Sequence, residues 1–373
     1  MTEQTTVPRH ATWLELFFDL VVVAAVAQLT HLLEHPDGLD VAAFFILYAA
    51  IWLVWSSFTV YANVASDRTR NRTMLLGMLG LAAMAAAIPQ ATGAHAAVFG
   101  AAYIYTSGVA SQGITRTGRL VIGWSAVQRN AGLMPFIIAF WFTDEPKYLL
   151  ALWAFGVALT LASGIVDDMK DPARLQEFQA RIERHAQRGR NPVPAVELRS
   201  TDGTHLGERL GLFIIIVLGE AVLQLVTAIS EVEWGWSQVG IGLAGFALLI
   251  GLWWLNFRYG FDEENATTPR VLLPAHLVVA VSVTLIAFGL GTAAEHATDP
   301  LPDLHRWLLC GALALCLTLC ALAHRAWWSL LLVAAPLAVA ALGAGLAAVF
   351  TVLVLAAATG GFVLSFHRRP AEA

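Results

Sequence analysis

Twelve apolar stretches divide this chain, and that pattern limits its fold more than any other feature. A helix that crosses a lipid bilayer needs about 20 predominantly apolar residues. Only 13% of the residues are charged, whereas a soluble domain has about 25%. The sequence therefore predicts an all-α, polytopic transmembrane bundle. The stretches lie near 13–34, 39–63, 73–91, 94–115, 120–142, 147–167, 206–230, 237–259, 271–294, 304–323, 326–343 and 346–366. Ten or eleven helices are the alternatives, because a short Gly-Ala-Gly turn separates the last two stretches.

The loop charges predict how the helices are oriented. Lys and Arg collect on the cytoplasmic side of membrane proteins. Alternate loops carry SDRTRNR, the Arg-rich polar stretch 168–205 and the tail Arg368-Arg369, whereas the loops between them, such as EHPDGLD and SEVEWGWS, are acidic or neutral. Both termini should therefore be cytoplasmic. The N-terminus MTEQTTVPRH lacks the basic start and cleavage site of a signal peptide, so the first apolar stretch is expected to remain as an anchor.

The polar stretch 168–205 also divides the chain into two transmembrane halves, 1–167 and 206–373, with six helices each. The second half opens with HLGERLGLFIIIVLGEAVLQL, which aligns with WLELFFDLVVVAAVAQL in the first and pairs Glu15 with Glu208. Six helices return the chain to the side where it began, so the halves are predicted to be parallel repeats. The alternative is that apolar helices resemble one another by composition alone.

Acidic residues lie inside two of these stretches. Glu15 and Asp19 are four residues apart and share one helix face. In the seventh helix, Glu208 lies near the start and Glu220 lies roughly 18 Å deeper. An ionised side chain at mid-membrane costs about 2.5–3.5 kcal/mol on insertion scales, so we expect these acids to face the bundle. For Glu15 and Glu208, interaction with the positive end of the helix dipole is the simpler explanation.

Two cationic or titratable residues are candidate partners for the acids. AVQRNAG places Arg129 inside the fifth stretch, where it needs a carboxylate such as Asp19 or Glu220, and His276 in the ninth helix can change its charge near neutral pH. Our leading hypothesis is a secondary-transporter-like protein that needs no cofactor. Its substrate or proton path would include Asp19, Arg129, Glu220, His276, Glu15 and Glu208. The competing interpretation is a charge network that only fixes the packing of the helices, as in a membrane-organising or sensory protein.

A second function class follows from acids at the predicted cytoplasmic helix ends. GIVDDMKD forms a DDxxD pattern with Asp167, Asp168 and Asp171, and FDEEN adds Asp262 on the same side. Such carboxylates can hold Mg²⁺ against a diphosphate. The alternative function is therefore a Mg²⁺-dependent membrane enzyme that acts on an isoprenoid diphosphate, like a terpene synthase or prenyltransferase. The argument against this enzyme function is that acidic residues often flank helix ends without binding a metal ion.

The remaining composition restricts the partners. The net charge is -5 and no strongly basic block occurs, so nucleic acid is not an expected partner. The expected partners are the lipid bilayer and a proton or small solute. Neither the oligomeric state nor the identity of the solute follows from these residues.

Three motifs carry a resemblance to a known family. They are ELFFDLV followed by AQL, then HLGERLGLFIIIVLGEAV, and, more weakly, LWWLNFRYGFDEEN before the helix of His276. On the basis of these motifs, almost the whole chain resembles the bacterial low-temperature-requirement A (LtrA) family. The resemblance implies a multi-pass protein of the bacterial plasma membrane. The family name describes a growth phenotype, so it implies no particular reaction.

Overall fold

The helices form where the apolar stretches predict them. The computed structural model describes residues 10–34, 36, 38–122, 124, 126, 130–166, 176, 180, 197–258 and 268–367. Within these residues there are twelve α-helices, one in each predicted stretch, so the all-α polytopic fold is confirmed. Among the described residues, nine helices are long and apolar enough to cross a membrane. The orientation of the termini stays a prediction.

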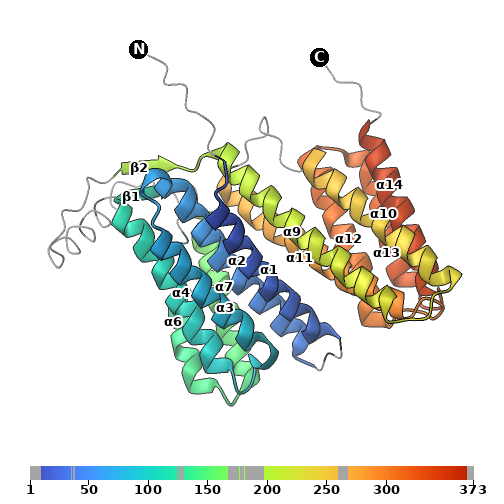
Figure 1. Cartoon of the computed structure of the whole chain (residues 1–373), viewed down its shortest axis with the longest axis horizontal. Coiled ribbons are helices and arrows are strands. Elements are labelled where there is room, and N and C mark those ends of the chain that lie inside the picture. The colour runs from blue at the N-terminus through green and yellow to red at the C-terminus, as the bar shows by residue number, and fades with distance from the viewer. Residues whose placement is uncertain are drawn as a thin grey trace, which may run out of the picture. The chain divides into compact units, whose positions relative to one another are not determined.

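The helices belong to two compact units, of which the first comprises residues 1–210 and 266–274. In unit 1, α1 lies against α2 and α3, and α4 lies against the same two helices (Figure 1). The first two turns of α9 also belong to unit 1. The helices are α1 (Trp13–Thr30), α2 (Asp40–Ala65), α3 (Asn71–Ala87), α4 (Ala96–Thr117), α6 (Leu133–Ile138), α7 (Pro146–Val166) and α9 (Gly203–Ser230).

Unit 2 comprises residues 211–265 and 275–373. Within it, α14 packs against α10, α12 and α13. Besides the rest of α9, its helices are α10 (Trp236–Arg258), α11 (Pro269–Glu295, of which the first turns belong to unit 1), α12 (Asp303–Ala323), α13 (Leu330–Leu342) and α14 (Ala348–His367). The division at 168–205 and the parallel repeat remain predictions.

The fifth stretch departs from the prediction of one helix over 120–142. Gly118, with φ of 69°, ends α4 in the left-handed region that favours glycine. The chain then forms β1 (Arg119–Ile122), which pairs in parallel with β2 (Glu197–Ser200). In the described part of this stretch, the longest helical segment is Leu133–Phe142. The prediction of a full-length fifth span was therefore wrong.

Arg119 explains why a strand starts there. Its guanidinium Nη1 donates to the carbonyl oxygens of Val64 (2.9 Å) and Ala65 (2.5 Å) at the end of α2. These are among the carbonyls that a helix C-terminus leaves without an intrahelical partner. Glu197 Oε2 on β2 lies 3.6 Å from Arg119 Nε. The arginine thus joins the end of α2 to both strands.

Close contact between α6 and α7 depends on two glycines and an aromatic stack. Phe136 stacks between Tyr103 and Trp153. Its ring centroid lies 4.0 Å from that of Tyr103 and 5.7 Å from that of Trp153. Gly132 and Gly156 let the backbones approach at this point: a Cβ on Gly156 would lie 2.7 Å from the carbonyl oxygen of Gly132. Small residues allow helices to pack this closely in membranes.

We expect Gly156→Ala to destabilise the protein by about 1–3 kcal/mol, because the added methyl group would overpack this contact. The matched control is Gly108→Ala in α4, where a Cβ would meet nothing within 4 Å. The control should lose no stability, because alanine is more favourable than glycine in a helix by about 1 kcal/mol. Thermal unfolding of the two variants in detergent measures the difference, and equal midpoints would contradict the packing described here.

Candidate functional site

The first helix begins with a capping box that fixes the orientation of Glu15. The backbone nitrogen of Glu15 donates to Thr12 Oγ1 (3.3 Å), and Glu15 Oε2 accepts from the Thr12 nitrogen (2.7 Å) and hydroxyl (2.9 Å). Reciprocal bonds of this kind satisfy the first free N–H groups of a helix. Glu15 therefore has the helix-start role that the sequence suggested. Its second carboxylate oxygen points further into unit 1.

Asp19, one turn deeper, forms a fully buried ion pair. Its Oδ1 accepts from Arg209 Nη2 at the start of α9 (2.5 Å) and from Trp55 Nε1 in α2 (2.7 Å). Both charged side chains have 0% exposure. The outer face of α1 is apolar instead, with Phe17 and Leu20 exposed as expected for lipid contact.

Glu15 completes this group from the same helix. Its Oε1 lies 3.6 Å from His205 Nε2 and 3.7 Å from Arg209 Nη1. His205 and Arg209 are four residues apart on α9, as Glu15 and Asp19 are on α1, so each helix presents one face with two such residues. We call these four residues the buried ionic cluster.

The protonation of His205 follows from its neighbours. The orientation of the Asn63 amide is fixed by Asp202, whose backbone nitrogen donates to Asn63 Oδ1 (2.8 Å) and whose carbonyl accepts from Asn63 Nδ2 (2.9 Å). The same Nδ2 lies 3.1 Å from His205 Nδ1. An amide nitrogen only donates, so Nδ1 must accept and carries no proton. We infer from this network a neutral imidazole with its proton on Nε2, on the side of Glu15.

The charges of the cluster do not balance. Among the described residues that meet here, two carboxylates face one guanidinium and one neutral imidazole, an excess of one negative charge. Several polar atoms also have no hydrogen-bond partner among the residues that the structure describes: Asp19 Oδ2, His205 Nε2, Arg209 Nε and Arg209 Nη1. Buried groups of this kind are costly, and they concentrate at functional sites.

A cavity of about 530 Å³ reaches the cluster at Glu15. It lies where α1 and α3 begin and α2 ends. Glu15 and Met74 are its buried members, whereas Trp13 is 88% exposed at the rim. We call it the Glu15 cavity. It is lined by Thr12, Trp13, Leu14, Glu15, Ser66, Thr69, Asn71 and Met74.

The sequence from residue 10 to residue 365 matches the model of a family described as Bacterial low temperature requirement A protein (LtrA). The chain belongs to this family. It is also similar to Uncharacterized protein RA0937 of Rhizobium meliloti (strain 1021), with 27% identity over 318 residues, which cover 78% of this chain and 71% of the relative. No solved structure matches the chain. The family and the apolar helices together establish a multi-pass membrane protein.

The other acids predicted for the site of this LtrA-family protein lie in different surroundings. Glu208 is one-third exposed and faces the start of α1, where its Oε2 accepts from the Ala11 nitrogen (3.2 Å). Glu220 lies in unit 2, half-buried, and its Oε1 accepts from Gln224 Nε2 (3.2 Å). His276 is buried in unit 2 against the ring of Phe213, with centroids 5.4 Å apart. Their roles in a path stay predictions.

Several predicted residues fall outside the described part of the LtrA-family chain. Arg129, the cation predicted to pair with Asp19, is one of them. So are all the residues predicted to hold Mg²⁺: Asp167, Asp168, Asp171 and Asp262. The described ranges contain no group of three or more His, Cys, Asp or Glu side chains that could hold a metal ion. The diphosphate enzyme therefore stays a prediction.

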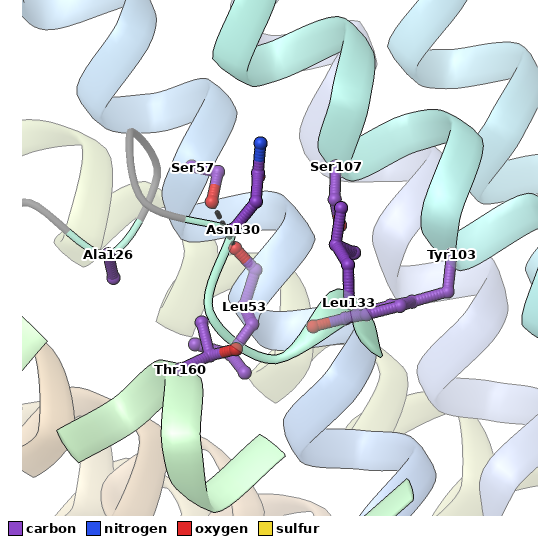
Figure 2. A pocket seen from close by; sticks show the side chains of 8 residues that line it. All are labelled: Leu53, Ser57, Tyr103, Ser107, Ala126, Asn130, Leu133 and Thr160. Carbon is purple, nitrogen blue, oxygen red and sulfur yellow. Dashed lines mark hydrogen bonds between the residues drawn. The ribbon is translucent and has the colours of Figure 1, made fainter. Parts of the chain in front are cut away.

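A second, narrow cavity is lined by Ala126 and Asn130, two described residues of the segment AVQRNAG. Its volume is about 10 Å³, room for about one water molecule. Figure 2 shows that Ser57, Tyr103 and Thr160 approach it from different helices of unit 1. The Ser57 hydroxyl donates to Leu53 O (2.7 Å) and the Thr160 hydroxyl to Gly156 O (2.9 Å). It contains no described ionisable acid or base apart from the Tyr103 phenol.

Sequence reasoning missed three members of the site in this LtrA-family protein, namely Arg209, His205 and Trp55. The signal for two of them was the matched spacing: HLGER places His205 and Arg209 four apart, and ELFFD does the same for Glu15 and Asp19. Two acids on one helix face and two basic side chains on another are complementary. Trp55 gave no comparable signal, since tryptophan is common in membrane helices.

Proposed function

We propose that this LtrA-family protein is a secondary-transporter-like carrier of the bacterial plasma membrane, with both termini cytoplasmic, and that the buried ionic cluster is its proton-binding site. No cofactor is required. Asp19 and Glu15 take up and release the proton, and Arg209 holds the two carboxylates close together.

The observation that carries this proposal is the excess negative charge of a cluster buried within apolar helices. Leaving a charge uncompensated in such surroundings costs several kcal/mol. A proton on one carboxylate removes that cost, so the cluster favours binding one proton.

The Glu15 cavity supports the proposal because it gives the cluster an opening. Glu15 lines the cavity and lies within 3.7 Å of Arg209, which in turn contacts Asp19. A proton can therefore enter at Glu15 and reach Asp19 one helical turn deeper. The cavity lies at the end of unit 1 that carries Arg68, which the loop charges predict to be cytoplasmic.

Proton uptake into proteoliposomes tests the proposal. Purified protein is reconstituted with a pH-sensitive dye inside the vesicles, and a potassium gradient with valinomycin supplies an inward driving force. We expect faster acidification than in protein-free vesicles of the same lipid. Equal rates in both preparations would contradict the proposed function.

A further inference from the structure

The Glu15 cavity has the size of a small-molecule site. Its volume of about 530 Å³ lies within the range of roughly 300–1,000 Å³ that is typical of ligand pockets. A single proton or a bare metal ion would leave most of this space unfilled. The cavity therefore suits an organic ligand that reaches the buried ionic cluster from outside.

The charge around the cavity favours a cation. In the described part of the chain, Glu15 is the one charged side chain that lines it. Behind Glu15 lie Asp19 from α1 and the neutral His205 and the charged Arg209 from α9, so the excess charge is negative. The other cavity-lining residues, from the turn after α2 and from α3, are uncharged. The nearby pair of His10 and Glu208 is not part of the lining.

Neutral oxygen atoms and an aromatic ring complete the lining. The Thr69 hydroxyl donates to Ala62 O (3.4 Å), which leaves its oxygen able to accept from a ligand. Ser66 and the Asn71 amide contribute further acceptors. The exposed indole of Trp13 offers a π-face, and ammonium groups bind over tryptophan rings in preference to other aromatic rings.

We propose that the Glu15 cavity binds an organic ammonium group, which competes with a proton for the excess negative charge of the buried ionic cluster. The competition rests on the proposed function, because the proposed function assigns the proton to Asp19 and Glu15, the carboxylates that would also attract the ammonium group. Cation and proton each neutralise this charge, so each lowers the affinity for the other by the same factor. A carrier with such a site exchanges one for the other.

Calorimetric titration of the purified protein with choline and with ethanolamine tests the proposal. We expect saturable binding with release of about one proton per cation, counted by repeating the titration in two buffers of different ionisation enthalpy. Affinity should fall by up to about tenfold per unit decrease in pH while the proton is the competitor. Acetate, an anion of similar size, should show no binding. An absence of choline and ethanolamine binding would overturn the proposal.

Variants of the lining locate the site. Trp13→Ala should weaken binding by about two- to fivefold through the lost ring face, and Glu15→Gln by at least about tenfold through the lost charge. Thr69→Val is paired with Thr115→Val in α4, whose half-buried hydroxyl donates to Ser111 O (2.8 Å) and does not line the cavity. Thr69→Val should weaken binding of the cation, whereas Thr115→Val should leave it unchanged. If Trp13→Ala, Glu15→Gln and Thr69→Val all leave the affinity for the cation unchanged, the assignment of the binding site to the Glu15 cavity is overturned.

The ammonium group can belong to a dissolved amine or to a lipid headgroup. Titration with choline in nanodiscs of phosphatidylglycerol, with and without phosphatidylethanolamine, separates the two sources. Weaker choline binding beside phosphatidylethanolamine assigns the site to the headgroup, and equal binding assigns it to the dissolved amine. Proton flux without ammonium binding would overturn this inference and leave the proposed function standing. Ammonium binding in a protein without proton flux would overturn the proposed function and the competition, but not the site.

Discussion

Asp19→Asn is expected to reduce potential-driven proton uptake to the rate of protein-free vesicles. The side chain is fully buried, and its Oδ1 accepts hydrogen bonds from Arg209 and Trp55. An asparagine oxygen can still accept both bonds, so the shape of the site is retained. The amide cannot take up a proton. The loss of flux would therefore come from the chemistry of the carboxyl group, without disruption of the fold.

The matched control for this variant is Glu231→Gln, an equivalent change at an exposed acid directly after α9. It should keep the wild-type rate. Size-exclusion profiles of both variants in detergent establish that each is folded before reconstitution. Wild-type proton uptake by a folded Asp19→Asn protein would show that the proton does not pass through Asp19.

Arg209→Met is expected to destabilise the protein by about 3–5 kcal/mol, the range seen when one partner of a buried ion pair is removed. The substitution keeps most of the apolar volume but removes the guanidinium that contacts both buried carboxylates, Asp19 and Glu15. Thermal unfolding in detergent at neutral pH measures the loss. Arg199→Met is the control, because Arg199 is more than half exposed and its removal should change stability by no more than about 0.5 kcal/mol.

A double variant separates charge from packing at Arg209. Adding Asp19→Asn to Arg209→Met removes one of the two negative charges that Arg209 contacts, so part of the lost stability should return. This coupling is the signature of two side chains in direct contact. Stability losses that simply add would contradict the buried ion pair.

The fold was predictable because each helix depends on a local pattern. About twenty apolar residues in a row are sufficient to define a spanning helix, and Thr12 with Glu15 marks the start of α1 through the spacing of a capping box. The fifth stretch escaped prediction because its structure depends on distant partners. Arg119 binds the end of α2, and β1 pairs with β2 almost eighty residues later. The hydropathy pattern along the chain does not reveal contacts between residues that are far apart in the sequence.

The candidate site was predictable only in part, for a similar reason. The depth of Asp19 in an apolar helix shows that it needs a partner, but the partner lies 190 residues away on α9. Arg129 lies deeper within an apolar stretch and was the cation predicted to pair with Asp19, whereas Arg209 lies near a helix start. The sequence does not show that Arg209 is buried, with 0% exposure, beside Asp19.

Infrared difference spectroscopy tests the central claim most directly, because it detects the carbonyl stretch of a protonated carboxyl group. Spectra of the reconstituted protein are compared between alkaline and acidic pH for the wild type, Asp19→Asn and Glu15→Gln. We predict a band from a buried carboxylic acid on acidification of the wild type, lost or shifted in at least one of these variants. A band that both variants retain unchanged, or the absence of any such band in the wild type, would contradict a proton-binding role for the buried ionic cluster.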